Sequence, residues 1–252
     1  MARLSRLDVV GWPHLLVQHV RAGERLVRDE SDRQALWLAM LDAARQTQMA
    51  VHAYAVLDDH FHVLVSPQQA GTLGAFMQAI GRRYVARYNH RYGRVGTLWD
   101  GRFRGTVVSP ERFLLESMLF VEQHPELVTP EPVAAANVGH VGGFGYSSLP
   151  HHLMYRSDPL IQDHAAFWAL GNTPFEREGA WRQLLATGLI SVERNRLADA
   201  MLKGWALVDP AQRMQLEQVT GRRMAPRPRG RPRKNEAIST EVVLEREDVT
   251  PI

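Results

Sequence analysis

Apolar residues recur along the first half of the chain with two periods, and the change of period separates predicted strands from predicted helices. Alternation is typical of a strand with one buried face, whereas spacing of three and four residues is typical of a helix. Leu36, Met40 and Ala44 follow the helical spacing. In chain order the pattern predicts a strand at 13–20, a helix at 29–47, strands at 49–57 and 60–65, a helix at 72–93, a strand within 95–109 and a helix at 111–124.

Residues that start or stop helices mark the ends of these elements. Ser31 is a candidate N-cap, and Ser109 followed by Pro110 is a helix start with proline at its first position. Gly93 is expected to end the helix before it. Pro125 is expected to stop the last helix, because proline removes a backbone donor and its ring crowds the preceding turn.

The order of the elements predicts the fold class. Asp58-Asp59 is a tight turn that makes the two central strands a hairpin. A strand-helix-strand-strand-helix-strand-helix order predicts an α+β fold, a ferredoxin-like antiparallel sheet with helices on one face. A loop at 129–145 and several short helices then make up a helical C-terminal extension, 129–224. The tail 225–252 has few apolar residues and is expected to be disordered.

Composition narrows the class of protein. The 252 residues include no cysteine, which excludes disulfides and thiolate metal sites and favours a reducing compartment. The chain has no apolar run of about 18 residues that would span a membrane, and its first residues lack the apolar core of a signal peptide. We expect a cytoplasmic protein.

Basic residues gather in two segments although the net charge is only +3. Residues 221–234 carry seven basic residues and no acid, and residues 82–104 carry seven arginines and one aspartate. The second segment also holds five aromatic residues, with arginines and tyrosines that each recur every four residues. Arginine interleaved with aromatic residues favours a nucleic-acid surface over a merely solvated face.

Two histidines enter an apolar strand together. In "DDHFHVLVSP", residues 58–67, His60 and His62 share one face of the strand while Phe61 points to the other. Two neutral imidazoles at this spacing can hold one metal ion. A half-exposed strand with two polar residues facing water is the alternative for an isolated motif.

The ordered set of motifs resembles the IS200-like single-tyrosine transposases, specifically the REP-associated tyrosine transposases. The likeness runs from about Val10 to Gly221 and includes "HAYAVLDDHFHVLVSP", "MQAIGRRYVARYNHRYGRVGTLWDGRFR", "ESMLFVEQHPELV" and "GYSSLPHHL". The resemblance implies a transposase domain at 8–128. It implies that His60 and His62 hold Mg²⁺ or Mn²⁺, which polarises a phosphate of hairpin single-stranded DNA for attack by a helix tyrosine.

The sequence departs from this family at the nucleophile. The family pattern Tyr-x-Glu-x-Asn-Pro corresponds to "FVEQHP" here, so Phe120 occupies the tyrosine position and strand transfer is expected to be impaired. His124 occupies the amide position one turn later and is a candidate third ligand, which would favour Zn²⁺. A histidine that interacts favourably with the helix C-terminal dipole is the alternative.

Other functions stay open at this point. The chain could be an active transposase that uses Tyr84 or Tyr88, a nuclease that uses a metal-activated water, or a non-catalytic DNA-binding regulator. For each of these functions we expect a bacterial, nucleoid-associated protein that acts as a monomer or homodimer. The tail motif "PRGRPRK" resembles an AT-hook that enters A·T-rich minor grooves, with a generic basic tail as the alternative. The expected DNA-binding residues are Arg82, Arg83, Arg87, Arg91, Trp99, Arg102, Arg104, Arg229 and Arg231.

Overall fold

The computed structural model describes residues 6–128 and 147–226. The elements, in chain order, are β1 (His14–His19), α1 (Glu30–Thr47), β2 (Met49–Val56), β3 (His60–Pro67), α2 (Thr72–Tyr92), β4 (Arg104–Val107), α3 (Leu114–Val128), α5 (Leu149–His152), α6 (Ala165–Trp168), α7 (Pro174–Thr187), α8 (Ser191–Lys203) and α9 (Pro210–Thr220). The predicted order of strands and helices is thus confirmed.

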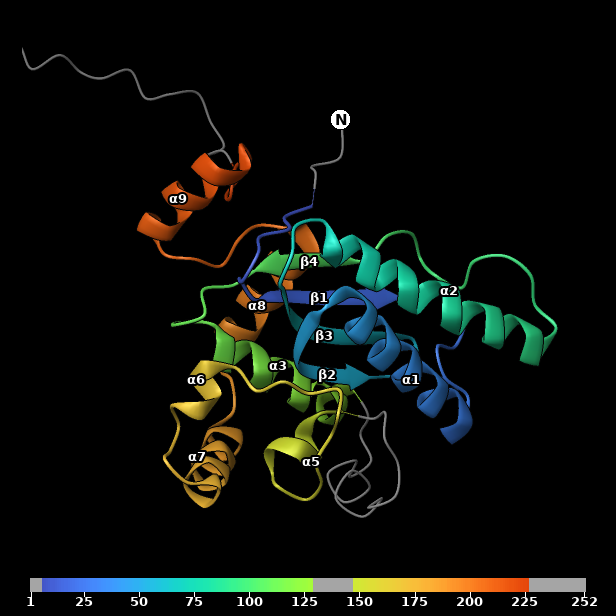
Figure 1. Ribbon diagram of the computed structural model, residues 1–252, viewed down its shortest axis with the longest axis horizontal. Helices are drawn as coiled ribbons and strands as arrows, with labels where there is room; N and C mark the ends of the chain where they lie inside the picture. The colour runs from blue at the N-terminus through green and yellow to red at the C-terminus, as the bar shows by residue number, and fades with distance from the viewer. Residues whose placement is uncertain (1–5, 129–146, 227–252) are drawn as a thin grey trace, which may run out of the picture.

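A four-stranded antiparallel sheet forms the centre of the molecule, with strand order β2-β3-β1-β4 (Figure 1). The predicted hairpin joins β2 to β3, while β1 lies between β3 and β4, strands that come later in the chain. This is the strand order of the ferredoxin-like fold, so the predicted α+β class is confirmed. The register places His19 of β1 opposite His60 of β3.

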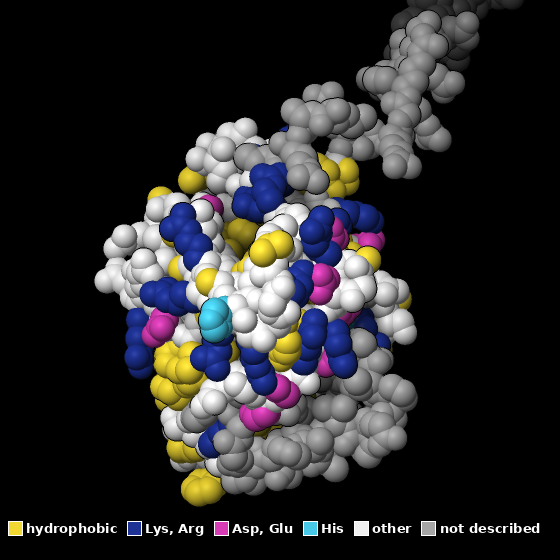
Figure 2. Space-filling model, turned by 90° about the vertical axis from the view of Figure 1, so that its right-hand side faces the viewer, with side chains coloured by type: hydrophobic (Ala, Val, Ile, Leu, Met, Phe, Trp, Pro, Cys, Tyr) yellow, Lys and Arg dark blue, Asp and Glu magenta, His cyan; other side chains and the backbone are white. Residues whose placement is uncertain are grey.

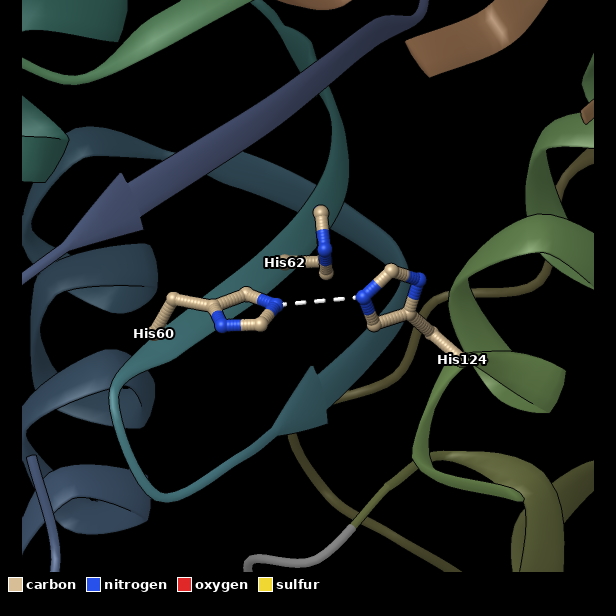
Figure 3. Close-up of side chains that lie close together, drawn as sticks. All are labelled: His60, His62 and His124. Carbon is tan, nitrogen blue, oxygen red and sulfur yellow. Dashed lines mark hydrogen bonds between the residues drawn. The ribbon is translucent and has the colours of Figure 1, made fainter. Parts of the chain in front are cut away.

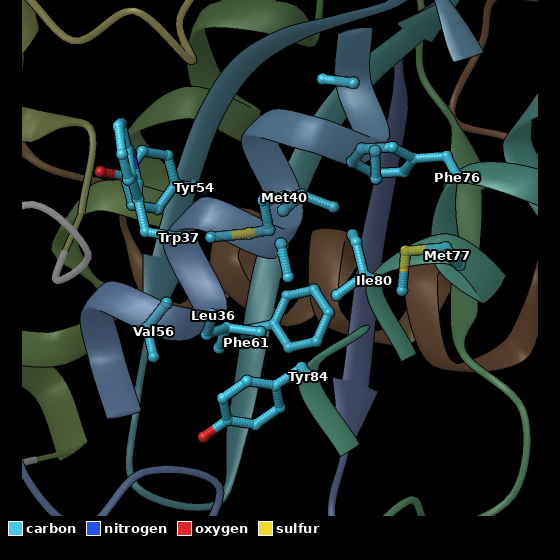
Figure 4. Packing of buried hydrophobic residues seen from close by; sticks show 14 of the residues in the cluster. Leu36, Trp37, Met40, Tyr54, Val56, Phe61, Phe76, Met77, Ile80 and Tyr84 are labelled. Atoms are coloured by element: carbon cyan, nitrogen blue, oxygen red, sulfur yellow. The ribbon is translucent and has the colours of Figure 1, made fainter. Parts of the chain in front are cut away.

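Helices α1 and α2 cover one face of the sheet, as the sequence predicts. Leu36 and Met40 of α1 are fully buried, and so are Phe76 and Ile80 of α2. Together with Phe61 from β3 they belong to one hydrophobic cluster (Figure 4). Phe61 therefore faces this core, which turns its neighbours His60 and His62 to the opposite face of the sheet.

The opposite face of the sheet is covered by helices as well, so the prediction of helices on one face only is wrong. Leu64 of β3 belongs to a second hydrophobic cluster with Met118 of α3, Trp181 of α7 and Leu197 of α8. Helices α5, α6, α7 and α8 therefore pack with α3 on this face, whereas α9 lies apart from them (Figure 1). The predicted boundary after residue 128 and the predicted loop at 129–145 fall on residues outside the described part of the chain.

Two predicted helix ends are wrong. The carboxylate of Asp29, not Ser31, caps α1 by accepting from the backbone N–H of Asp32, whereas the Ser31 hydroxyl accepts from Arg87. Helix α3 begins at Leu114, because the Ser109 hydroxyl bonds the Glu111 carboxylate instead of a backbone N–H.

Pro125 does not stop α3, which continues to Val128. Proline costs a helix one hydrogen bond, but its fixed backbone angle is itself helical. Three preceding turns of α3 are anchored by buried Leu114, Met118 and Val121, and this packing keeps the helix in place. The described helices include none long and apolar enough to cross a membrane.

Candidate metal centre

His60, His62 and His124 converge on one point between β3 and α3 (Figure 3). The Nε2 atoms of His60 and His124 lie 3.2 Å apart. The His62 ring lies 4.9 Å from the His60 ring and 4.5 Å from the His124 ring, centroid to centroid. The three predicted ligands are therefore brought together, although 62 residues separate His62 from His124 in the chain.

The surroundings favour the neutral form of His62 and His124, which is the form that binds metals. Burial holds the pKa of His62 well below its ordinary value, and the nearby His124 and His60 lower it further. Burial and His60 likewise lower the pKa of His124 to about 4. Nδ1 of His60 lies 2.6 Å from a carboxylate oxygen of Asp59. A hydrogen bond donated by Nδ1 to Asp59 leaves the Nε2 lone pair directed at the cluster. A carboxylate is a usual second partner of a metal-binding histidine.

The unsatisfied nitrogen atoms test whether a metal ion fits. Both ring nitrogens of His62 and Nδ1 of His124 are buried without a hydrogen-bond partner among the described residues. Metal–nitrogen bonds of about 2.0–2.1 Å place two tetrahedral ligands about 3.3–3.4 Å apart, close to the separation of His60 and His124. The residues thus fit a divalent ion, and three imidazoles suit Zn²⁺ better than Mg²⁺.

Phe120 occupies the space beside the histidines. Its ring is 4% exposed and lies 5.5 Å from the His62 ring and 5.4 Å from the His124 ring. The helical spacing of four residues brings Phe120 and His124 to the same side of α3, as the sequence predicts. A phenyl ring offers no oxygen or nitrogen, so this position cannot supply a nucleophile.

The alternative nucleophiles Tyr84 and Tyr88 are not available for chemistry. Both are buried at 1% exposure, on the face of the sheet opposite to the histidines. The hydroxyl of Tyr84 donates to the carbonyl of Leu26, and that of Tyr88 to the carbonyl of Arg25. Burial raises the pKa of Tyr84 further above its ordinary value. The prediction that either one could act as the nucleophile is therefore wrong.

A fourth imidazole, missed by sequence reasoning, adjoins the cluster. His19 of β1 stacks on His60 with ring centroids 4.9 Å apart. It also lines a small cavity with Arg102 and Arg104. No local signal marks His19, because its position beside His60 depends on which residues of β1 and β3 pair.

The predicted DNA-binding arginines form two groups. Arg102 and Arg104 are exposed and line a cavity of about 370 Å³ together with Arg6, Lys203 and Arg222. An open groove of about 630 Å³ runs beside it, bordered by Arg82, Arg102 and the half-buried Trp99. Basic side chains are spread over the face of the molecule shown in Figure 2.

The second group of arginines faces α1. Arg91 is paired with Asp29 and Asp32, and Arg83 lies 3.8 Å from Asp42. The tyrosines between these arginines pack into the core, so the predicted aromatic stripe is core packing and not an exposed surface. Arg229 and Arg231, with the tail that carries them, lie outside the described residues.

Comparisons with known proteins bear on the identity of the fold. Residues 14–111 match the family model "Transposase IS200 like", a segment that contains His60 and His62 and ends before α3. A comparison with curated proteins finds no match.

Two solved structures are similar to this chain. One, described as a REP-associated tyrosine transposase bound to a REP hairpin, is 17% identical with a TM-score of 0.47 and covers 66% of this chain and 96% of its own. The other, a proposed transposase from Deinococcus radiodurans R1, is 22% identical with a TM-score of 0.34 and covers 50% of this chain and 97% of its own.

Proposed function

We propose that this chain uses residues 14–111, which match the model of the IS200-like transposases, to bind hairpin single-stranded DNA without forming the phosphotyrosine bond of that family. The observation that supports this proposal is the convergence of His60, His62 and His124 with Phe120 beside them. The protein keeps the residues that hold a metal ion and a phosphate but has an inert ring in place of the nucleophile.

Each residue of the cluster has a distinct task in this proposal. A divalent ion bound by the three imidazoles would supply Lewis-acid polarisation of a phosphate oxygen. Asp59 orients His60 by accepting a hydrogen bond from Nδ1. Phe120 supplies apolar surface beside His62 but no attacking atom.

The DNA strand would approach from the basic side of the sheet. His19 connects the cluster to the cavity lined by Arg102 and Arg104, whose guanidinium groups can contact the phosphate backbone of a strand that reaches the histidines. Arginine contacts to phosphates position a strand without reading its sequence. These arginines therefore support binding of a DNA strand that places one phosphate at the histidines.

Metal content tests the centre directly. The double variant His60→Ala, His62→Ala is expected to bind one equivalent of metal per chain less than wild type in elemental analysis after purification. His90→Ala, which changes an exposed histidine of α2, is the matched control and should retain the full content. Equal metal content in the double variant and the control would show that the centre holds no ion.

A gel assay with end-labelled hairpin DNA tests the activity. Wild-type protein with Mg²⁺, Mn²⁺ or Zn²⁺ is expected to retard the DNA and to leave no adduct that survives denaturation. A covalent band mapped to any tyrosine would refute the loss of the nucleophile. Nicked DNA without an adduct would instead indicate a nuclease that uses a metal-activated water.

A further inference from the structure

A second cluster of potential ligands lies among the C-terminal helices. His151 and His152 end α5, and Asp163 precedes α6. Nε2 of each histidine lies 3.4 Å from the same carboxylate oxygen, Oδ1 of Asp163. One ligand atom from each of the three residues lies within 4.8 Å of the others. None of these residues belongs to the cluster of His60, His62 and His124.

The atoms that face one another here lack ordinary partners. The His152 side chain has no exposed surface, and that of Asp163 is 15% exposed. Nε2 of His152 and Oδ1 of Asp163 are buried without a hydrogen bond, so their 3.4 Å contact does not have hydrogen-bond geometry. Burial alone would lower the pKa of His152, but the carboxylates of Glu122 and Asp163 raise it to about 9, so a bound cation would replace the proton that this ring holds between them.

The spacing matches tetrahedral coordination. Metal bonds to nitrogen and carboxylate oxygen of about 2.0–2.2 Å place ligand atoms about 3.3–3.6 Å apart at the tetrahedral angle. Both histidine contacts to Asp163, at 3.4 Å, fall within this range. Two histidines and one carboxylate are a ligand set that zinc uses when one coordination position stays open.

A second carboxylate supports His152 from behind. Glu122 of α3, also without exposed surface, lies 2.5 Å from Nδ1 of His152. It accepts further hydrogen bonds from Ser148 and from the indole of Trp181, so its position is fixed. The hydrogen bond that Nδ1 donates to Glu122 fixes the ring, so that Nε2 can bind an ion once its proton has left.

His151 must change its protonation and one hydrogen bond before it can bind an ion through Nε2. Its Nδ1 accepts a 3.0 Å hydrogen bond from the backbone N–H of Asp158, so the neutral ring carries its proton on Nε2. Binding through Nε2 exchanges that proton and hydrogen bond for a metal bond. His152 gives up its Nε2 proton but keeps its contact with Glu122, and Asp163 needs no exchange, so these two residues form the core of the site.

Access to this cluster exists from outside. His151, His152 and Asp163 line a pocket of about 320 Å³, whose other walls include Trp168 and Glu178. A hydrated ion can enter through such a pocket, and water or a small ligand can fill the remaining coordination position. From this geometry we propose that His152, Asp163 and His151 bind one divalent transition-metal ion of the zinc type, independently of the first centre.

The test uses the full chain at pH 8 in the His60→Ala, His62→Ala background, which removes the first centre. Co²⁺ is titrated into chelator-stripped protein, because tetrahedral Co²⁺ has visible absorption bands. We expect one bound equivalent with tetrahedral bands, lost in the added variant Asp163→Ala and weakened at least about tenfold in the added variant His151→Ala. Glu178→Gln, in the same pocket, is the matched control and should bind as the background does.

The outcomes separate this site from the first one. Absence of binding in the folded background protein would overturn the proposal and leave an ion-pair network of Glu122, His152 and Asp163 in its place. Binding that persists after Asp163→Ala would also overturn it, because the ion would then lie elsewhere. Circular dichroism of each variant shows that it is folded, and His151→Ala, which changes a partly exposed side chain, keeps the test valid if Asp163→Ala unfolds.

Discussion

Phe120 lacks the hydroxyl oxygen that a tyrosine would offer as a nucleophile. Helix α3 presents its ring to His62 with the ring centroids 5.5 Å apart, and packing around it is tight, with 4% of the residue exposed. The neighbouring Glu122 fixes the rotation of this helix, because its buried carboxylate is bound to Ser148, His152 and Trp181. The position of the Phe120 ring is therefore set by the structure.

Adding a hydroxyl to the ring at position 120 is expected to supply a nucleophile that attacks DNA. Phe120→Tyr should form a covalent adduct with labelled hairpin DNA in Mg²⁺ or Mn²⁺, detected as a protein–DNA band in denaturing gels. Wild type should form none. The same substitution in the His60→Ala, His62→Ala background is the control and should stay inactive. An adduct in that background would show that attack does not depend on the metal centre.

At the scale of elements, α2 combines two functions that its sequence does not distinguish. The tyrosines at every fourth residue bury themselves against the chain before α1, whereas the arginines beside them pair with acids or amides of α1. Two carboxylates offset the charge of Arg91, so this arginine attracts a phosphate only weakly. Strand β4 and the loop before it instead carry arginines that face the cavity near His19.

DNA affinity should therefore depend on this loop and strand more than on the end of α2. The double variant Arg102→Ala, Arg104→Ala is expected to flatten the plot of log K against log salt by about 1.4, since each lost phosphate contact contributes about 0.7 for single strands. Arg91→Ala is the matched control, and its slope should change by less than about half a unit. Fluorescence anisotropy across a salt series measures both. An opposite ranking of the variants would place the strand along α2 and α1.

At the scale of the whole molecule, the C-terminal helices complete the fold that residues 14–111 begin. Val107 of β4 and Leu216 of α9 share a small hydrophobic cluster with Met224, which is fully buried. The backbone N–H of Met224 also donates to Glu217. The folded part thus includes Met224, two residues before the last described residue.

Removal of residues 227–252 should leave folding unchanged. This segment has too few apolar residues to contribute to a core, so the melting temperature of the truncated chain should equal that of the full chain. Affinity for A·T-rich duplex DNA should fall, because the basic residues at 227–234 are lost. A melting temperature lower by several degrees would show that the tail packs on the folded part.

Acid should destabilise the folded protein through His14. Burial lowers the pKa of this fully buried histidine to about 4, while the unfolded chain keeps the ordinary value of 6.5. Between these values the unfolded state binds the extra proton, so the free energy of unfolding falls as the pH drops from 6.5 to 4. The loss is about 3 kcal/mol at most.

Urea unfolding at several pH values measures this dependence. His14→Gln removes the titrating group and should reduce the slope of stability against pH below 6.5. His90→Ala, at an exposed position, is the control and should retain it. An unchanged slope in His14→Gln would assign the acid sensitivity to other groups.

The sequence by itself determined the order of elements and the shared strand face of His60 and His62. Both follow from backbone periodicity, which is a local property: two residues repeat along a strand and about 3.6 along a helix. The same reasoning placed His124 one turn after Phe120. It failed at Ser31 and Pro125, where the choice between neighbouring caps and the fate of one helix turn depended on side chains far away in the chain.

Only the tertiary structure decided which histidines meet. His19 reaches His60 through the pairing of β1 with β3, and His124 reaches them through the packing of α3 against the sheet. The tyrosine stripe became core and the arginines divided between α1 and the groove for the same reason. These contacts join residues tens of positions apart, and their free energy depends on the whole packed arrangement, which no local pattern contains.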